Sequence, residues 1–151
     1  MDDFAAAELH GLRGLSNVDI PYLAQLIGDR RGTTVEISEL AALSAGDTCG
    51  YWIPLPDERR DVILHAPTPS EVHRQQLILH ELAHMFLRHD ESDDLDDHMS
   101  RFIPDLPGVR VFARSSFHDE LELAAERLAD ALAATIRSSS REPGAFEGIW
   151  G

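Results

Sequence analysis

Residues 77–87 have the sequence Leu77-Ile78-Leu79-His80-Glu81-Leu82-Ala83-His84-Met85-Phe86-Leu87, an apolar run interrupted by two histidines and one glutamate. Thr68 and Ser70 are candidate caps for a helix that carries this run. Residues four apart lie on one helix face, so His80 and His84 can present imidazole nitrogens to a single ion. Glu81 projects from the adjoining edge of that face, where a carboxylate can deprotonate a metal-held water. The spacing therefore predicts a buried helix carrying two zinc ligands and a general base.

Catalytic zinc normally has three protein ligands and an open position for water, so one more ligand must come from elsewhere in the chain. In the metzincin arrangement, a glycine three residues after the second histidine turns the chain toward a third ligand. Leu87 occupies that position here, so we expect the helix to continue and to carry Asp90 away from the metal. His89 stands at the wrong offset for a ligand. A metzincin-like site using Asp90 is therefore the less favoured alternative.

A second amphipathic helix from about Asp119 offers the preferred third ligand, Glu126. Asp130 follows one turn later on the same side and is predicted to fix the tautomer of a zinc-bound histidine through its ring N–H. Glu122 is the alternative ligand, because it lies four residues before Glu126 on nearly the same face. Small residues would let this helix approach the first one closely, and they are Ala125, Ala129 and Ala133.

The rest of the chain predicts a small α+β domain. Asp19-Ile20-Pro21 is typical of a helix start, and the apolar stripe behind it ends near Gly28 and Gly32. Alternating, β-branched residues predict strands over 33–38, 48–53 and 61–65, which together form a three-stranded, mostly antiparallel sheet. A weaker helix is expected around residues 9–15. We expect one domain over 1–151, with an acidic loop insert at 90–117 that holds a short strand near 109–113, and a flexible tail at 138–151.

Composition narrows the class of function. Twenty-seven acidic residues against 13 Lys and Arg give the 151-residue chain a formal charge of -14, which disfavours binding to nucleic acid or to an anionic membrane surface. Cys49 is the only cysteine, so neither a disulfide nor a Cys-rich zinc site can form within the chain. The N-terminal residues lack the basic start and apolar core of a secretory signal, and no apolar run is long enough for a membrane span. We expect a cytoplasmic protein.

Two segments resemble the ImmA/IrrE family of bacterial zinc metallopeptidases, which are gluzincins with the HExxH motif and a small thermolysin-like core. The segment Leu79 to His89 is similar to the family's His-Glu-Leu-Gly-His run with its leucines and trailing histidine. Glu126-x-x-Ala129-Asp130-x-Leu132-Ala133 is similar to its Glu-x-x-Ala-Asn/Asp-x-Phe-Ala segment. The resemblance implies zinc ligation by His80, His84 and Glu126. It also implies a regulatory protease that cuts a helix-turn-helix transcriptional repressor.

These observations predict a zinc-dependent endopeptidase in which Glu81 relays a proton from water to the leaving amine. A group that stabilises the oxyanion is also expected, and His118, Tyr51 and Arg114 are the candidates. The alternative function is a zinc-stabilised binding module, or a toxin-like partner, that sequesters a DNA-binding regulator without proteolysis. His65, His73 and His98 are interpreted as ordinary polar or strand-end residues.

Overall fold

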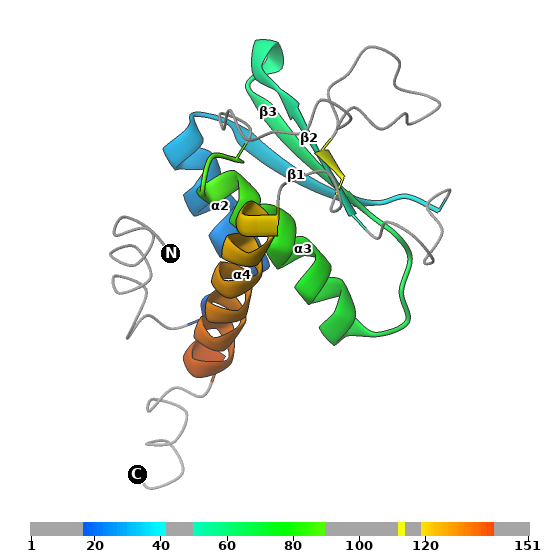
Figure 1. Cartoon of the computed structure of the whole chain (residues 1–151), viewed down its shortest axis with the longest axis vertical. Coiled ribbons are helices and arrows are strands. Elements are labelled where there is room, and N and C mark those ends of the chain that lie inside the picture. Colours follow the sequence, from blue (N-terminus) through cyan, green and yellow to red (C-terminus); the bar gives the residue numbers. More distant parts are fainter. Residues whose placement is uncertain (1–16, 42–49, 90–111, 114–118, 141–151) are drawn as a thin grey trace, which may run out of the picture.

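The computed structural model describes residues 17–41, 50–89, 112–113 and 119–140, and within these ranges the chain has an α+β fold (Figure 1). The expected helix at residues 9–15, most of the insert at 90–117 and residues 141–151 lie outside the described residues. The start of the expected tail at residue 138 is corrected, since the last helix runs to Ser140 and Ser139 is buried. In chain order the elements are α2 (Ile20–Arg31), β1 (Thr34–Glu39), β2 (Gly50–Leu55), the 3-10 turn η1 (Pro56–Glu58), β3 (Arg60–His65), α3 (Glu71–Phe86), β4 (Phe112–Ala113) and α4 (Asp119–Ser140).

The sheet is mixed, with the strand order β1-β3-β2-β4. β2 and β3 form an antiparallel hairpin around η1, and β4 pairs antiparallel with the other edge of β2. β1, however, runs parallel to β3, with Thr34 opposite Arg60 and Glu39 opposite His65. The sheet is mostly antiparallel, as expected, but not purely so, because β1 pairs parallel with β3, which lies between β1 and β2. The short β4 falls inside the stretch 109–113 where a strand was expected.

Local capping explains where the first two described helices begin. The Asp19 side chain accepts a hydrogen bond from the backbone N–H of Tyr22, and Pro21 lies in the first turn of α2. α2 ends at Arg31 and is followed by Gly32, whose φ of 72° is the left-handed conformation that glycine adopts without strain. The Ser70 side chain caps α3 by accepting from the N–H of His73. The caps expected near Asp19 and Ser70, and the stop at Gly32, are confirmed.

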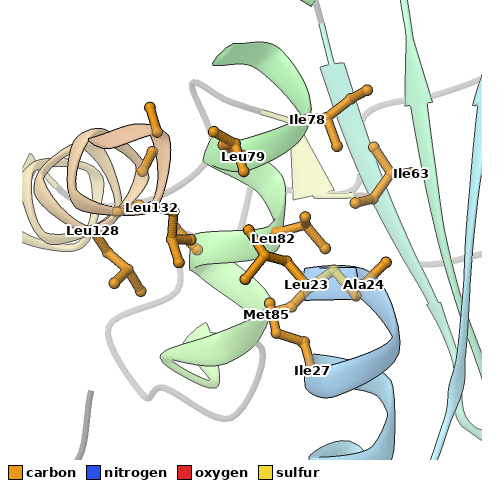
Figure 2. Close-up of a cluster of buried hydrophobic side chains, with 14 of the residues drawn as sticks. Leu23, Ala24, Ile27, Ile63, Ile78, Leu79, Leu82, Met85, Leu128 and Leu132 are labelled. Carbon is orange, nitrogen blue, oxygen red and sulfur yellow. The ribbon is translucent and has the colours of Figure 1, made fainter. Parts of the chain in front are cut away.

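α3 is the central element of the fold. It lies between the sheet on one side and α4 on the other, and α2 packs beside it (Figures 1 and 2). The core includes Leu23 and Ile27 from α2, Ile63 from β3, and Leu128 and Leu132 from α4, all of them buried against α3. Because this part of α3 is covered on both sides, its polar residues His80, Glu81 and His84 are held in a dry, rigid setting. None of the described helices is long and apolar enough to cross a membrane.

A buried ion pair ties α2 to the sheet and to the end of α3. Arg31 donates from Nε to Asp61 Oδ2 (2.7 Å) and from Nη2 to Oδ1 (3.2 Å), while its Nη1 donates to the carbonyl oxygen of Met85 (3.1 Å). Asp61, only 1% exposed, also accepts from Thr33 Oγ1 (2.7 Å) and Trp52 Nε1 (2.9 Å). Four donor hydrogens therefore satisfy this carboxylate, which makes its burial tolerable.

Replacing Asp61 by alanine should lower the free energy of unfolding by about 3–5 kcal/mol, because the Arg31 guanidinium would stay buried without its counter-charge. Urea denaturation of the two proteins, followed by circular dichroism, measures the difference. Glu36→Ala is a suitable control, since the Glu36–Arg60 pair is largely exposed and screened by solvent. Equal losses in the two variants would contradict a special role for the buried pair.

Candidate metal centre

His80 and His84 lie on one face of α3, one turn apart, as their spacing predicts. Both side chains are buried, with residue exposures of 1% and 0%. Their Nε2 atoms point toward each other at 3.1 Å, and the two rings meet edge to face. Two neutral imidazoles cannot both direct a lone pair at the other across this distance without repulsion. A shared proton or a shared cation resolves the contact.

Glu122, in the first turn of α4, brings a carboxylate to the same point. Its Oε2 lies 3.0 Å from His80 Nε2, and its Oε1 lies 3.2 Å from His84 Nε2. Within the part of the chain that the structure describes, His80, His84 and Glu122 form a group whose ligand atoms all lie within 4.8 Å of one another. Two helices from distant parts of the sequence therefore converge on one small volume.

The donor set fits zinc. Two imidazole nitrogens and one carboxylate oxygen are a known ligand set for catalytic zinc, which keeps a fourth position open. For bonds of about 2.0–2.2 Å in a tetrahedron, the ligand atoms stand roughly 3.3–3.6 Å apart. The two imidazole nitrogens stand 3.1 Å apart, so this pair needs only a small outward shift to admit the ion. The two oxygens of Glu122 lie close to the pair, Oε2 at 3.0 Å from His80 Nε2 and Oε1 at 3.2 Å from His84 Nε2.

The surroundings of Glu122 keep its carboxyl group ionised, which is the form that binds a metal ion. Burial alone would raise the pKa of this carboxyl, but hydrogen bonds and charge interactions with His80 and His84 outweigh burial and lower its pKa to about 2. The group is therefore ionised at neutral pH. An ionised oxygen next to two imidazole nitrogens is a strong attractor for a divalent cation.

The prediction of Glu126 as the third ligand is corrected by the structure. Glu126 is exposed on α4 and is not part of the cluster; the alternative, Glu122, takes that place. At about 100° per residue, Glu122 lies roughly 50° from the centre of the buried stripe of α4, whereas Glu126 lies roughly 90° away. The apolar positions of α4 can be identified from the sequence alone. Their angular distance to each glutamate could therefore have shown that Glu122 is the better candidate.

Asp130 does not contact either histidine of the pair. It is exposed, and its Oδ1 accepts a hydrogen bond from Gln76 Nε2 at 3.1 Å. α3 and α4 run antiparallel, so a residue later in α4 contacts a residue earlier in α3. Glu122 therefore lies beside His80, whereas Asp130 lies beside Gln76. Asp130 therefore does not fix the tautomer of a candidate zinc ligand, as was expected. It instead joins α4 to α3 through Gln76, at a distance from the cluster.

Glu81 is buried, with 1% exposure, and packs against the first residue of β2. A Cβ atom added to Gly50 would lie 3.3 Å from Glu81 Oε1 and 3.5 Å from Glu81 Cγ. Gly50 is not among the described residues with positive φ, so its backbone conformation does not require glycine. The lack of a side chain there instead makes room for Glu81. The sheet thus leaves room for the glutamate carboxylate at Gly50.

Tyr51 is excluded as an oxyanion stabiliser at this position. Side chains alternate along a strand, so Tyr51 points to the sheet face opposite the one on which Gly50 meets Glu81. There it packs in a separate apolar cluster around Ile53, together with Leu55, Val62 and Leu64. Arg114 and His118, the other candidates for this role, lie outside the described residues, as does Asp90, the less favoured alternative for the third ligand.

Two of the histidines interpreted as ordinary are described, and His98 lies outside the described residues. His65 is buried at the end of β3, where its Nδ1 lies 3.1 Å from the carbonyl oxygen of Ala66. His73 is exposed in the first turn of α3, near Thr68 Oγ1. Neither belongs to the cluster formed by His80, His84 and Glu122.

No protein-family model and no curated protein matches the chain. The resemblance to the ImmA/IrrE family therefore stays a prediction that depends on the motif around His80 and on the glutamate helix.

Proposed function

We propose that this chain is a zinc-dependent endopeptidase with a minimal thermolysin-like core, in which His80, His84 and Glu122 hold the metal and Glu81 is the general base. The proposal rests on one observation: three ligand atoms from α3 and α4 converge within 4.8 Å, with a buried glutamate next in sequence to the first of them. Among the described residues the group has three ligands, and this number favours a catalytic zinc site over a structural one, since structural zinc normally has four.

Each residue has a distinct part in the proposed reaction. When bound, zinc polarises a carbonyl oxygen and lowers the pKa of water. His80 and His84 hold the ion through neutral Nε2 atoms, and Glu122 supplies the negative charge. Glu81 accepts a proton from the water that attacks the peptide carbonyl, and it then donates that proton to the leaving amine. Apolar neighbours such as Leu79, Leu82 and Ala83, all fully buried, keep the surroundings of low polarity and so strengthen these charge interactions.

The proposed substrate is a protein with a basic surface, such as a helix-turn-helix transcriptional repressor. A formal charge of -14 repels nucleic acid but favours encounter with the basic face that a DNA-binding protein presents. The motif resemblance supports the same substrate class. The activity is accordingly proposed as regulatory and cytoplasmic.

Zinc-dependent cleavage tests the proposal directly. The purified chain is assayed for zinc, then incubated with a helix-turn-helix protein encoded by a neighbouring gene and, as a general substrate, with unfolded casein. Mass spectrometry should detect fragments that disappear when a chelator removes the metal and return when zinc is restored. A zinc-loaded chain that binds the repressor but leaves it and casein intact would contradict the peptidase proposal and favour the sequestering module.

Gly50→Ala should slow hydrolysis roughly 10-fold while zinc binding is unchanged. The added methyl group would lie 3.3 Å from Glu81 Oε1 and displace the carboxylate by a few tenths of an ångström; a full 1 Å misplacement can cost about 100-fold. Steady-state kinetics and zinc analysis on the same preparation measure both effects. A variant with the kinetics of the unmodified chain would show that this contact does not position Glu81.

A further inference from the structure

The chain turns sharply just after the histidine pair. α3 ends at Phe86, the Leu87 N–H donates to the carbonyl oxygen of Ala83 (3.0 Å), and the Arg88 N–H donates to that of Met85 (3.1 Å). Arg88 has a φ of 57°, which is the left-handed conformation that residues other than glycine seldom adopt. This turn brings the next residue, His89, back against the helix.

His89 is buried against the outer side of His84. It is 5% exposed, its Nδ1 lies 2.7 Å from His84 Nδ1, and the two ring centroids are 4.9 Å apart. The opposite nitrogen of His84, Nε2, faces His80 and Glu122. His84 is therefore held from both sides, by the candidate ligands at one nitrogen and by a third histidine at the other.

The proton on His84 can then be assigned by chemistry. A neutral imidazole carries one N–H, and a nitrogen that binds a cation must offer its lone pair. If Nε2 faces the metal, the proton is on Nδ1 and is donated to the lone pair of His89 Nδ1. His89 in turn carries its own proton on Nε2.

We propose that His89 is a positioning residue for the metal centre: by accepting a hydrogen bond from His84 Nδ1, it selects the His84 tautomer whose Nε2 lone pair points at the ion. The inference rests on the proposed zinc site. Partners of this kind, which hold a ligating histidine by its second nitrogen, typically contribute a factor of about 10–100 to metal affinity. His89 thus acts through His84 and does not itself bind the ion.

Zinc affinity of the full chain, measured by competition with a chromophoric chelator, tests this role without depending on hydrolysis. His89→Phe fills a similar volume but accepts no hydrogen bond, so zinc affinity should fall about 10–100-fold. His89→Asn places an amide oxygen close to the position of Nδ1 and should restore most of the affinity. Cobalt substitution adds a spectroscopic readout, since the visible absorption bands of bound Co²⁺ respond to the orientation of its ligands and should change in the phenylalanine variant alone.

Arg88→Gly is the matched control, because glycine adopts the left-handed conformation readily and leaves His89 unchanged. Its zinc affinity should equal that of the unmodified chain. Unchanged affinity in His89→Phe, or an equal loss in the phenylalanine and asparagine variants, would overturn the positioning role while leaving the zinc site intact. A loss in Arg88→Gly as large as in His89→Phe would also overturn it, since the turn would then matter more than the imidazole. An unmodified chain that binds no zinc would instead overturn the proposed function together with this inference.

Discussion

Glu81→Gln should lower kcat/KM for peptide hydrolysis by roughly 10²–10⁴-fold while the zinc content of the protein stays the same. Glutamine matches glutamate in size and can still form hydrogen bonds in the space beside Gly50, but its neutral amide cannot take a proton from water. The group that carries out proton transfer is thus removed while the metal ligands and the fold remain. Hydrolysis rates and elemental zinc analysis on the same preparation measure the two quantities.

Glu71→Gln is the control for this experiment, because Glu71 is an exposed acid at the start of the same helix and pairs with Arg74 there. Its kinetics should match those of the unmodified chain. If Glu81→Gln hydrolysed peptides at the full rate, Glu81 would not be the base. If it lost zinc together with activity, Glu81 would belong to the ligand set and the assignment of roles would have to change.

The central helix was predictable because its signals are local. Ser70 can cap a helix by itself, and an apolar run with two polar positions four residues apart has one natural geometry. The positions of His80 and His84 on a shared face follow from helical periodicity alone. The structure adds that both sides of α3 are covered, which is why these polar side chains become buried.

The third ligand is harder to predict from the sequence, because its identity depends on how α3 and α4 pack against each other. Glu122 and Glu126 lie one turn apart, and each is followed by alanines at similar spacing, so the motif fits in either register. The deciding quantity is the rotation of α4 about its axis, which is set by the burial of Leu128 and Leu132 against α3. Weighing the whole apolar stripe of α4, and not the motif alone, favours Glu122.

The sheet order and the place of His89 also depend on contacts between distant or turning segments. Neighbouring strands in sequence pair more often than not, but the neighbour of β1 in this sheet is β3 and not β2. His89 was excluded as a ligand by its offset, and it is indeed not in the ligand group. Its contact with His84 arises from the left-handed turn at Arg88, which nothing in the local sequence favours.

Glu122→Gln should weaken zinc binding by about 100-fold or more, whereas Glu126→Gln should leave it unchanged. Removing a residue that only orients a ligand typically costs about 10–100-fold, so removing a charged ligand should cost at least the upper end of that range. Glu126 is exposed on the neighbouring part of α4, which makes it a control of identical chemistry on the same helix. Chelator competition measures both affinities. A large loss in the Glu126 variant with little change in the Glu122 variant would mean that α4 is rotated when the metal binds, and the ligand set inferred from the cluster would be wrong.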